Sequence, residues 1–519
     1  MNIYLIFLSL LTSAFFFNRG FAYYDEGFIL HAAQRVLQGE VPYRDFDLIY
    51  TPGSVYLTAA AFKLLGESIL TGRILMLLVS WLTGYLVYLI CVKATNNRMG
   101  AFLAVSIYFA WGPSHINFPW PSLLALSAGL FTILILSKFL TGTRNPFDKL
   151  RPSALRLLRL EEIPCLSRDR FGMTSVGLMT FVTFLFKQNF GVAVLLTVIV
   201  STGLMRPMSQ MELLGKIKRY LFGAMVVGLI FTVYLLLTGS LSGFIDNFYF
   251  YTIKSFLIGG VAATSFPSGL KGGFYLLPGL VSIIAVFVAY KRQRKALILP
   301  IFGLTFYLSG IRPTTDYPHL VVLMSMIGLP LAVIISNFQV QATRNSREHP
   351  GGDKGAVVWK TGWLLLGISL IGIGFYTALF KDYYRWDSPL IKQNYFLKEG
   401  RAKIFADQKF SMIVPEIVAE IKKNSKRDGF IFVFPNAPMF YFLSGRKNPT
   451  RFINFPGGLQ TKSQEQEVIE ALKNKKVKLI LTNEPESKWT YQIIKKHLSG
   501  NYFKKKQILE FVIWKRNES

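Results

Sequence analysis

The sequence predicts a polytopic α-helical membrane protein with a small α/β domain after its last membrane span. Three observations lead to this fold class. Of the 519 residues, 51% are hydrophobic and only 17% are charged, whereas about a quarter of the residues of a soluble protein are charged. Apolar runs that approach or exceed the length needed to cross a bilayer recur through the first three quarters of the chain. The last quarter instead mixes short apolar strands with amphipathic helices.

The apolar runs predict about eleven membrane spans, all within residues 1–380. The first run is expected to be a membrane anchor rather than a cleaved signal peptide, because it lacks a basic start and a small-residue cleavage site. Gly100–Gly112 and the two runs around Lys187 are short enough to tilt or to be re-entrant. The expected spans are Ile3–Phe21, Ser68–Val92, Gly100–Gly112, Pro121–Leu140, Gly172–Phe186, Phe190–Met205, Tyr220–Thr238, Phe274–Tyr290, Ala296–Gly310, Leu320–Phe338 and Trp359–Phe380.

The basic residues between the spans fall in loops that the span order places on a single side of the membrane. The positive-inside rule makes this side cytoplasmic, so the formal net charge of +29 is no argument for a nucleic-acid partner. The opposite side then receives the first loop, residues 22–67, and everything after Phe380. The basic loops contain Lys93 and Arg98, Lys138–Arg170, Arg206–Arg219, Lys291–Lys295 and Arg344–Lys354.

Residues 381–519 are expected to form an extracytoplasmic domain, separate from the transmembrane domain of residues 1–380. Helices that alternate with short apolar strands are typical of a small α/β domain. The excess of Lys and Arg in this tail favours either an anionic surface as partner or a solubilising basic face. The expected helices are Ile413–Asn424, Ser463–Lys473 and Tyr491–Leu498, and the expected strands are Gly429–Phe434, Val477–Thr482 and Ile508–Trp514.

Adjacent carboxylates, Asp25 and Glu26, directly follow the first span. Carboxylates at a membrane surface are unfavourable without a partner or a purpose, and one that is buried beside an apolar span has a raised pKa that suits a general base. The residues Gly27–Gln38 then alternate in polarity as an interfacial amphipathic helix does. The alternative interpretation is that Asp25 and Glu26 only cap this helix.

A second acidic cluster, Asp45 and Asp47, and the aromatic turn Tyr50–Gly53 follow this helix. Together with the acidic pair, this pattern resembles the GT-C superfamily of membrane glycosyltransferases, in the branch of the protein O-mannosyltransferases and the lipid A aminoarabinose transferase. The resemblance extends over the whole chain. It implies a GT-C-type bundle of about 11 helices with an extracytoplasmic α/β domain. It also implies that Asp25 activates the acceptor hydroxyl, with Glu26 as its neighbour or alternative.

The donor that the resemblance implies is a polyprenyl-phosphate sugar, whose phosphate needs cationic partners near the membrane surface. The candidates on the outer side are Lys187, Arg312 and Arg73. Lys187 begins the polar triplet Lys187–Asn189, which resembles a Lys-Gln turn of the superfamily; the alternative is a lysine that extends to the lipid interface. For the turn Arg312–His319, the alternative is a local Arg–Asp pair with a satisfied histidine.

Further polar and aromatic residues on the outer side are expected to contact the substrate: Asp45, Asp47, Tyr50, Gln188, Asp316 and His319. In the tail, Arg446 and Arg451 belong to a stretch that looks like a motif of bacterial members of the superfamily. These two arginines either face an anionic acceptor or lipid headgroup, or stabilise a structural turn.

No cofactor is expected. The sequence has no His-x-x-x-His or Cys-x-x-Cys spacing among its five histidines and two cysteines. Asp25, Asp45 and Asp47 could gather a divalent cation, but the branch that the sequence resembles is regarded as metal-independent. Neither a Walker A motif nor a Gly-x-Gly-x-x-Gly fingerprint supports nucleotide binding.

The expected function is transfer of a hexose or pentose from a polyprenyl-phosphate donor to an acceptor hydroxyl, with inversion at the sugar carbon, at the outer leaflet of a bacterial inner membrane. A glycolipid, a polysaccharide and a protein all remain open as acceptors. Two other classes compete with this interpretation. One is a flippase or transporter of lipid-linked saccharides, against which the acidic loop and the folded tail argue. The other is a polysaccharide polymerase or ligase.

Overall fold

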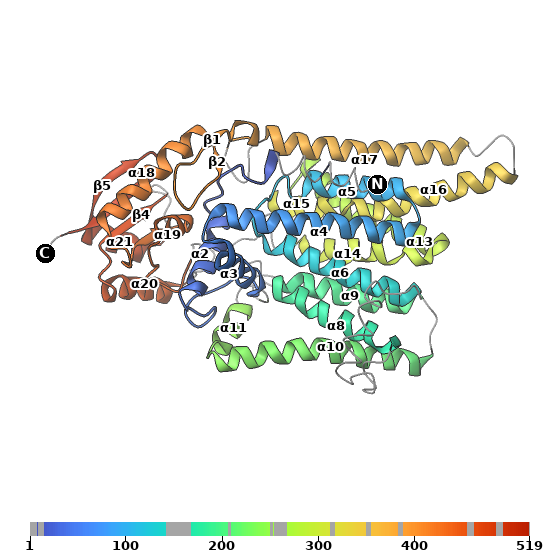
Figure 1. The fold of residues 1–519 in the computed structure, drawn as a ribbon, viewed down its shortest axis with the longest axis horizontal. Coiled ribbons are helices and arrows are strands. Elements are labelled where there is room, and N and C mark those ends of the chain that lie inside the picture. Colours follow the sequence, from blue (N-terminus) through green and yellow to red (C-terminus); the bar gives the residue numbers. More distant parts are fainter. Residues whose placement is uncertain are drawn as a thin grey trace.

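The computed structural model describes residues 8, 15–141, 168–205, 209–249, 253, 267–311, 317–348, 354–381, 388–453, 461–483 and 491–517. These residues form a long helical bundle that is joined at one end to a smaller part, which contains the β-strands of the described chain (Figure 1). The chain therefore has the expected fold class, a polytopic helical membrane protein with a C-terminal α/β part.

The helices of the bundle coincide with the expected spans. Seven helical stretches of the described residues are long and apolar enough to cross a membrane, and shorter apolar helices lie between them. The first expected span, Ile3–Phe21, lies almost wholly outside the described residues. The observed helices are α4 (Ile69–Thr95), α5 (Arg98–Trp111), α6 (Pro121–Thr141), α8 (Arg168–Phe186), α9 (Gln188–Met205), α10 (Gln210–Leu237), α13 (Gly269–Arg292), α14 (Ile298–Gly310), α15 (Tyr317–Met326), α16 (Gly328–Glu348) and α17 (Lys354–Phe380).

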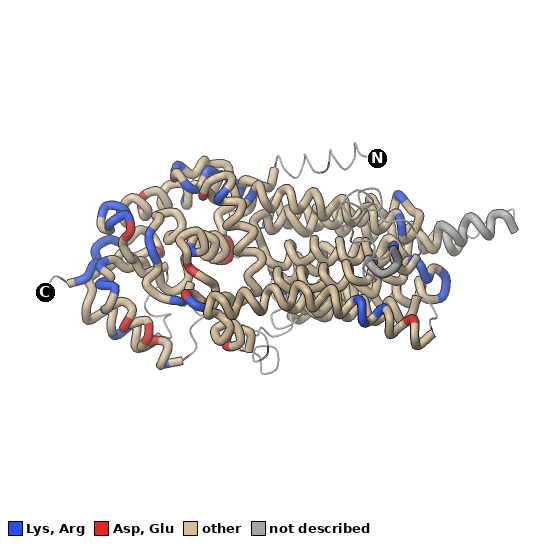
Figure 2. The backbone as a smooth tube through the Cα atoms, turned by 60° about the horizontal axis from the view of Figure 1, so that its bottom comes forward, with Lys and Arg blue, Asp and Glu red and all other residues tan. Residues whose placement is uncertain are grey.

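The outer surface of the bundle is apolar. On α10, for example, Leu221, Leu229 and Ile230 are exposed, as side chains that face lipid are. Lys and Arg instead gather at the two ends of the molecule, on the smaller part and at the far end of the bundle (Figure 2). Those at the far end belong to the loops that the sequence assigns to the cytoplasm.

The smaller part contains a four-stranded sheet of order β3-β4-β6-β5, in which only β3 and β4 are parallel. The expected helices and strands are present with shifted ends. Strand β5 was not expected from the sequence, because its Lys504–Lys506 run is exposed on the sheet edge, where lysines discourage further strand pairing. The elements are β1 (Tyr395–Phe396), β2 (Phe405–Ala406), α18 (Gln408–Asn424), β3 (Phe432–Phe434), α19 (Met439–Ser444), α20 (Lys462–Asn474), β4 (Leu479–Thr482), α21 (Gln492–Asn501), β5 (Tyr502–Ile508) and β6 (Phe511–Arg516).

The first loop folds into helices between the bundle and the tail. Helix α2 (Asp25–Leu37) is the expected amphipathic helix, but it does not lie on a membrane surface, because every residue from Glu26 to Arg35 is buried. Its polar positions meet the tail: His31 stacks on Tyr441 with ring centroids 4.6 Å apart. Two further short helices were not expected from the sequence: α3 (Gly53–Leu65), within the first loop, and α11 (Leu241–Phe248), in the outer segment after α10.

Candidate functional site

The aromatic Pro-Gly turn of the first loop closes onto the break between α8 and α9. The Thr51 hydroxyl donates to the carbonyl of Phe184 (2.5 Å). The Gln188 amide donates to the Ile49 carbonyl (3.2 Å) and accepts from the Thr51 backbone N–H (3.4 Å). The approach requires glycine at position 53, since a Cβ there would lie 2.5 Å from the carbonyl oxygen of Leu185. The structure therefore places the first loop directly against the Lys-Gln turn.

Lys187 occupies this break and is turned inward, with only 5% of its surface exposed. Its ammonium donates to the Ser122 hydroxyl (2.6 Å) and lies 5.3 Å and 5.0 Å from the ring centroids of Tyr50 and Phe190. Trp120 packs edge-on against Tyr50, at 6.2 Å between ring centroids. The ammonium is thus enclosed by a hydroxyl and aromatic rings rather than extended to a lipid interface. A cation in such a weakly hydrated place interacts strongly with an anion.

Glu26 and Arg73 form a fully buried ion pair. The Arg73 guanidinium donates to both carboxylate oxygens, at 2.6 Å and 2.7 Å, and both side chains have zero exposure. Arg73 also donates to the carbonyls of Arg19 (2.7 Å) and Gly20 (2.9 Å). Burial raises the pKa of the Glu26 carboxyl, and the Arg73 guanidinium acts against that increase. The structure therefore commits the two side chains to each other, whereas we expected Glu26 beside the chemistry and Arg73 on the donor phosphate.

Asp25 opens α2 and is partly exposed, in contrast to Glu26. Tyr24 holds the cap position without a side-chain cap bond, and its hydroxyl accepts a hydrogen bond from Tyr23 (2.7 Å). Asp25 and Glu26 thus occupy the first helical turn, where the helix dipole favours carboxylates, rather than the cap itself. Of the acidic pair, only Asp25 keeps a surface that a substrate can reach.

The second acidic cluster is divided between two sets of partners. Asp45 accepts from the Val41 backbone N–H (2.7 Å) and pairs with Arg44 (2.7 Å), and the hydrogen bond from Arg44 lowers the pKa of the Asp45 carboxyl. Asp47 pairs with Arg451 of the tail (2.7 Å). Burial raises the pKa of Asp47 and the Arg451 guanidinium opposes this. Within the described ranges, these carboxylates do not join Asp25 in a group that could hold a metal ion.

The outer turn before α15 is only partly described. Arg312 and Asp316 lie outside the described residues, and His319 is partly exposed in the first turn of α15. A different histidine, which is not among the expected site residues, is buried nearby: His115 accepts at Nδ1 from the Tyr317 hydroxyl, and its Nε2 donates to the Gly374 carbonyl (3.0 Å). Burial lowers the pKa of His115 to about 4, so it is neutral near pH 7. The sequence feature that could have indicated this buried site is a histidine within an apolar turn.

The tail arginines both bind protein groups. Arg446 donates to the Ser425 hydroxyl (2.8 Å) and to the Ser444 carbonyl (2.9 Å), which fits the interpretation of a structural turn. Arg451 binds Asp47 and, through Nε, Glu467 (2.8 Å). The motif therefore stabilises the tail at Arg446 and connects the tail to the first loop at Arg451.

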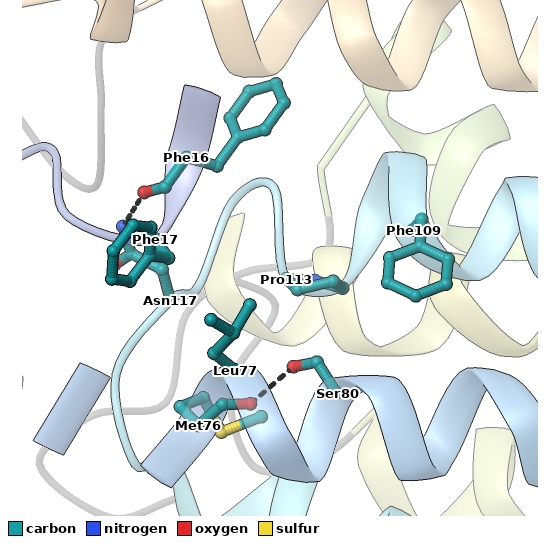
Figure 3. A pocket seen from close by; sticks show the side chains of 8 residues that line it. All are labelled: Phe16, Phe17, Met76, Leu77, Ser80, Phe109, Pro113 and Asn117. Carbon is teal, nitrogen blue, oxygen red and sulfur yellow. Dashed lines mark hydrogen bonds between the residues drawn. The ribbon is translucent and has the colours of Figure 1, made fainter. Parts of the chain in front are cut away.

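A small apolar pocket lies where the chain enters the first loop (Figure 3). Asn117 at its rim donates to the carbonyls of Phe16 and Arg19 and so holds the entry to that loop. The pocket is separate from the Lys187 cluster. Its lining residues are Phe16, Phe17, Met76, Leu77, Ser80, Phe109, Pro113 and Asn117.

No protein-family model and no curated protein matches this sequence. Among solved structures, ArnT from Cupriavidus metallidurans bound to undecaprenyl phosphate matches 100% of this chain and 98% of its own, with a TM-score of 0.54 and 12% sequence identity. This chain shares the fold of ArnT. Apo ArnT from the same organism matches 99% of this chain and 97% of its own, with a TM-score of 0.48 and 11% identity. The ArnT fold extends over the bundle, the first loop and the α/β tail alike, which confirms the expected architecture of a helical membrane bundle with a C-terminal α/β part.

Proposed function

We propose that this protein is a membrane glycosyltransferase that transfers a sugar from a polyprenyl-phosphate donor to an acceptor hydroxyl at the outer leaflet of a bacterial inner membrane. The observation that carries the proposal is the enclosed ammonium of Lys187 beneath the first loop. The first loop covers this ammonium. The fold of the whole chain matches that of a protein crystallised with undecaprenyl phosphate. An acidic residue, Asp25, leads the same loop.

In this proposal, Lys187 binds the donor phosphate. The Ser122 hydroxyl lies 2.6 Å from the ammonium. It would therefore act as a second hydrogen-bond donor to the same phosphate oxygen. When the sugar–phosphate bond breaks, negative charge grows on the departing phosphate, and a preorganised cation in a water-poor place stabilises that charge. Arg312 of the outer turn is proposed as the second cation on this phosphate.

Asp25 is proposed as the general base. Its carboxylate takes the proton of the acceptor hydroxyl, the acceptor oxygen bonds to the anomeric carbon, and the bond from that carbon to the phosphate oxygen breaks. The polyprenyl phosphate leaves with the bonding electron pair, and a single in-line displacement inverts the anomeric carbon. The buried Glu26–Arg73 pair supports this role indirectly, because it holds the first turn of α2 in place.

The remaining expected residues divide by what they already bind. Tyr50 has a partly exposed ring beside Lys187 and is proposed to contact the sugar, since aromatic faces suit the apolar face of a sugar ring. His319 and Asp316 of the outer turn are proposed to bind sugar or acceptor hydroxyls. Gln188 uses its amide to hold Ile49 and Thr51, so we assign it to the shape of the site.

The test is transfer by the purified protein in nanodiscs, with labelled sugars on undecaprenyl phosphate as donors and extracted envelope glycolipids, polysaccharides and proteins as acceptors. Asp25→Asn is expected to lower the transfer rate by about 10²–10⁴-fold, the usual contribution of a general base, while the donor still binds. Lys187→Gln is expected to lower it by about 10²-fold or more and to weaken binding of undecaprenyl phosphate.

Matched controls are Asp246→Asn on α11 and Lys63→Gln on α3, which change exposed residues of the same types. Full transfer by Asp25→Asn would remove Asp25 from the chemistry. Movement of lipid-linked sugar across the membrane without turnover would replace the enzyme by a transporter. Lengthening of lipid-linked oligomers would instead identify a polymerase.

A further inference from the structure

The tail binds the first loop through one arginine, Arg451. The Nη1 group of Arg451 donates to both carboxylate oxygens of Asp47, at 2.9 Å and 2.7 Å, while the Asp47 backbone N–H donates to the Arg451 carbonyl (3.0 Å). The opposite edge of the guanidinium binds Glu467 of α20, at 2.8 Å and 3.2 Å. Arg451 therefore connects Asp47 to the folded tail through both side chain and main chain.

Asp47 is also held from the bundle side. Asn247 of α11 donates to its Oδ1 (3.3 Å), and the Asp47 side chain is only 10% exposed. A parallel link supports the same loop, because Arg35 of α2 donates to the carbonyls of Thr450 (3.0 Å) and Asp45 (3.1 Å). Tail residues 450 and 451 thus bind the loop at Arg35 and at Asp47, respectively.

The segment that follows Asp47 leads directly to the Lys187 cluster. Tyr50 and Thr51 lie three and four residues beyond Asp47, and these are the residues that meet Lys187 and Gln188. The Tyr43 hydroxyl donates to the Tyr50 carbonyl (2.7 Å), which braces the segment against bending. A chain this short and this well supported transmits a displacement at Asp47 to the Tyr50 ring.

We infer that Arg451 and Asp47 are positioning residues of the donor site: the α/β tail sets the place of Tyr50 over Lys187 through this ion pair. The inference rests on the proposed function, in which Lys187 binds the donor phosphate. It gives the tail a specific task in donor binding and assigns Asp47 a partner in the tail instead of the substrate contact expected from the sequence.

The experiment compares Arg451→Gln, Asp47→Asn and their double variant with Arg451→Lys and with a matched pair, Glu67→Gln and Arg401→Gln. The matched pair also joins the first loop to the tail (3.0 Å, side chains 30% and 34% exposed), but it lies at the other end of the loop. The readouts are equilibrium binding of undecaprenyl phosphate, donor KM and kcat, the unfolding temperature, and hydrogen exchange at the Thr51 amide.

Arg451→Gln and Asp47→Asn are expected to weaken undecaprenyl phosphate binding and to raise donor KM, both by about 10–100-fold, since small misplacements at an active site have effects of this size. The double variant should be no worse than either single one, and Arg451→Lys should recover part of the loss. Exchange at Thr51 should accelerate. The unfolding temperature should move by no more than about 1–2 °C, because a partly exposed pair adds little stability.

Equal losses in Glu67→Gln and Arg401→Gln would overturn the inference, as would unchanged Thr51 exchange or a KM loss that appears only with a loss of fold. Normal binding, exchange and transfer in the Arg451 and Asp47 variants would refute the inference while the proposed function stands. A wild-type protein that neither binds undecaprenyl phosphate nor transfers sugar would refute the proposed function, and Thr51 exchange would still report on the positioning.

Discussion

Removal of one partner from the buried Glu26–Arg73 pair should destabilise the protein measurably. Glu26→Gln keeps the shape of the side chain but leaves the guanidinium of Arg73 buried without its counter-charge. Breaking a buried pair in this way costs about 3–5 kcal/mol. With an unfolding entropy of roughly 2.1 cal/mol/K per residue, a chain of 519 residues should lose about 3–5 °C of unfolding temperature.

The assay is thermal unfolding of the detergent-purified protein, followed by tryptophan fluorescence. The double variant Glu26→Gln/Arg73→Met removes both charges and should be less destabilised than the sum of the single variants, because neither charge is then left alone. Glu416→Gln is the control, since its pair with Lys506 (2.8 Å) lies on the exposed tail surface. The reasoning would be refuted if the unfolding temperature of Glu26→Gln differed from that of wild type by no more than about 1 °C, which is the change expected when an exposed ion pair is lost.

Gly53→Ala should destabilise the protein by about 1–3 kcal/mol, because the added Cβ would lie 2.5 Å from a carbonyl oxygen of α8, whereas Gly372→Ala, with nothing within 4 Å, should not; thermal unfolding of the two variants decides this. Burial lowers the pKa of His31 to about 3 and that of His115 to about 4, so between these values and their usual pKa of about 6.5 the unfolded chain binds protons that the folded chain does not. The free energy of unfolding should therefore fall as pH drops from about 6.5 toward 4, by up to about 1.4 kcal/mol per pH unit for each histidine. His31→Gln and His115→Gln should each flatten this pH dependence in denaturant titrations; an unchanged slope would contradict the neutral, buried state of the histidine concerned.

The bundle and most of the tail could be predicted because their signals are local. A bilayer requires a continuous apolar run of fixed length, and most of the runs end within five residues of the observed helices. The exceptions are α10, which begins ten residues before its expected start, and the expected span Leu320–Phe338, which is divided between α15 and α16 and continues ten residues further. In the tail, helix α18 begins five residues before its expected start, at Gln408, where the Asp407 side chain accepts from the Phe410 backbone N–H (2.8 Å). Strand β5 escaped prediction because an edge strand with exposed lysines has no apolar alternation to detect.

The burial of α2 could not be predicted, because amphipathic alternation describes a helix with two kinds of neighbour and does not identify them. The polar face of such a helix can be satisfied either by a membrane surface or by a folded tail. The structure supplies tail partners such as Tyr441 for His31 and the Thr450 carbonyl for Arg35, and these lie more than 400 residues away along the chain.

The sequence by itself determined the class of protein, the order of its spans, and the small set of carboxylates and cations that follow the first span and interrupt the later ones. Only the tertiary structure decided how that set divides. It pairs Glu26 with Arg73, 47 residues away, and Asp47 with Arg451, 404 residues away, and it leaves Asp25 partly exposed and Lys187 enclosed beside Tyr50. The physical reason is that ion pairing and burial depend on distance in space, which the spacing of residues along a chain does not encode.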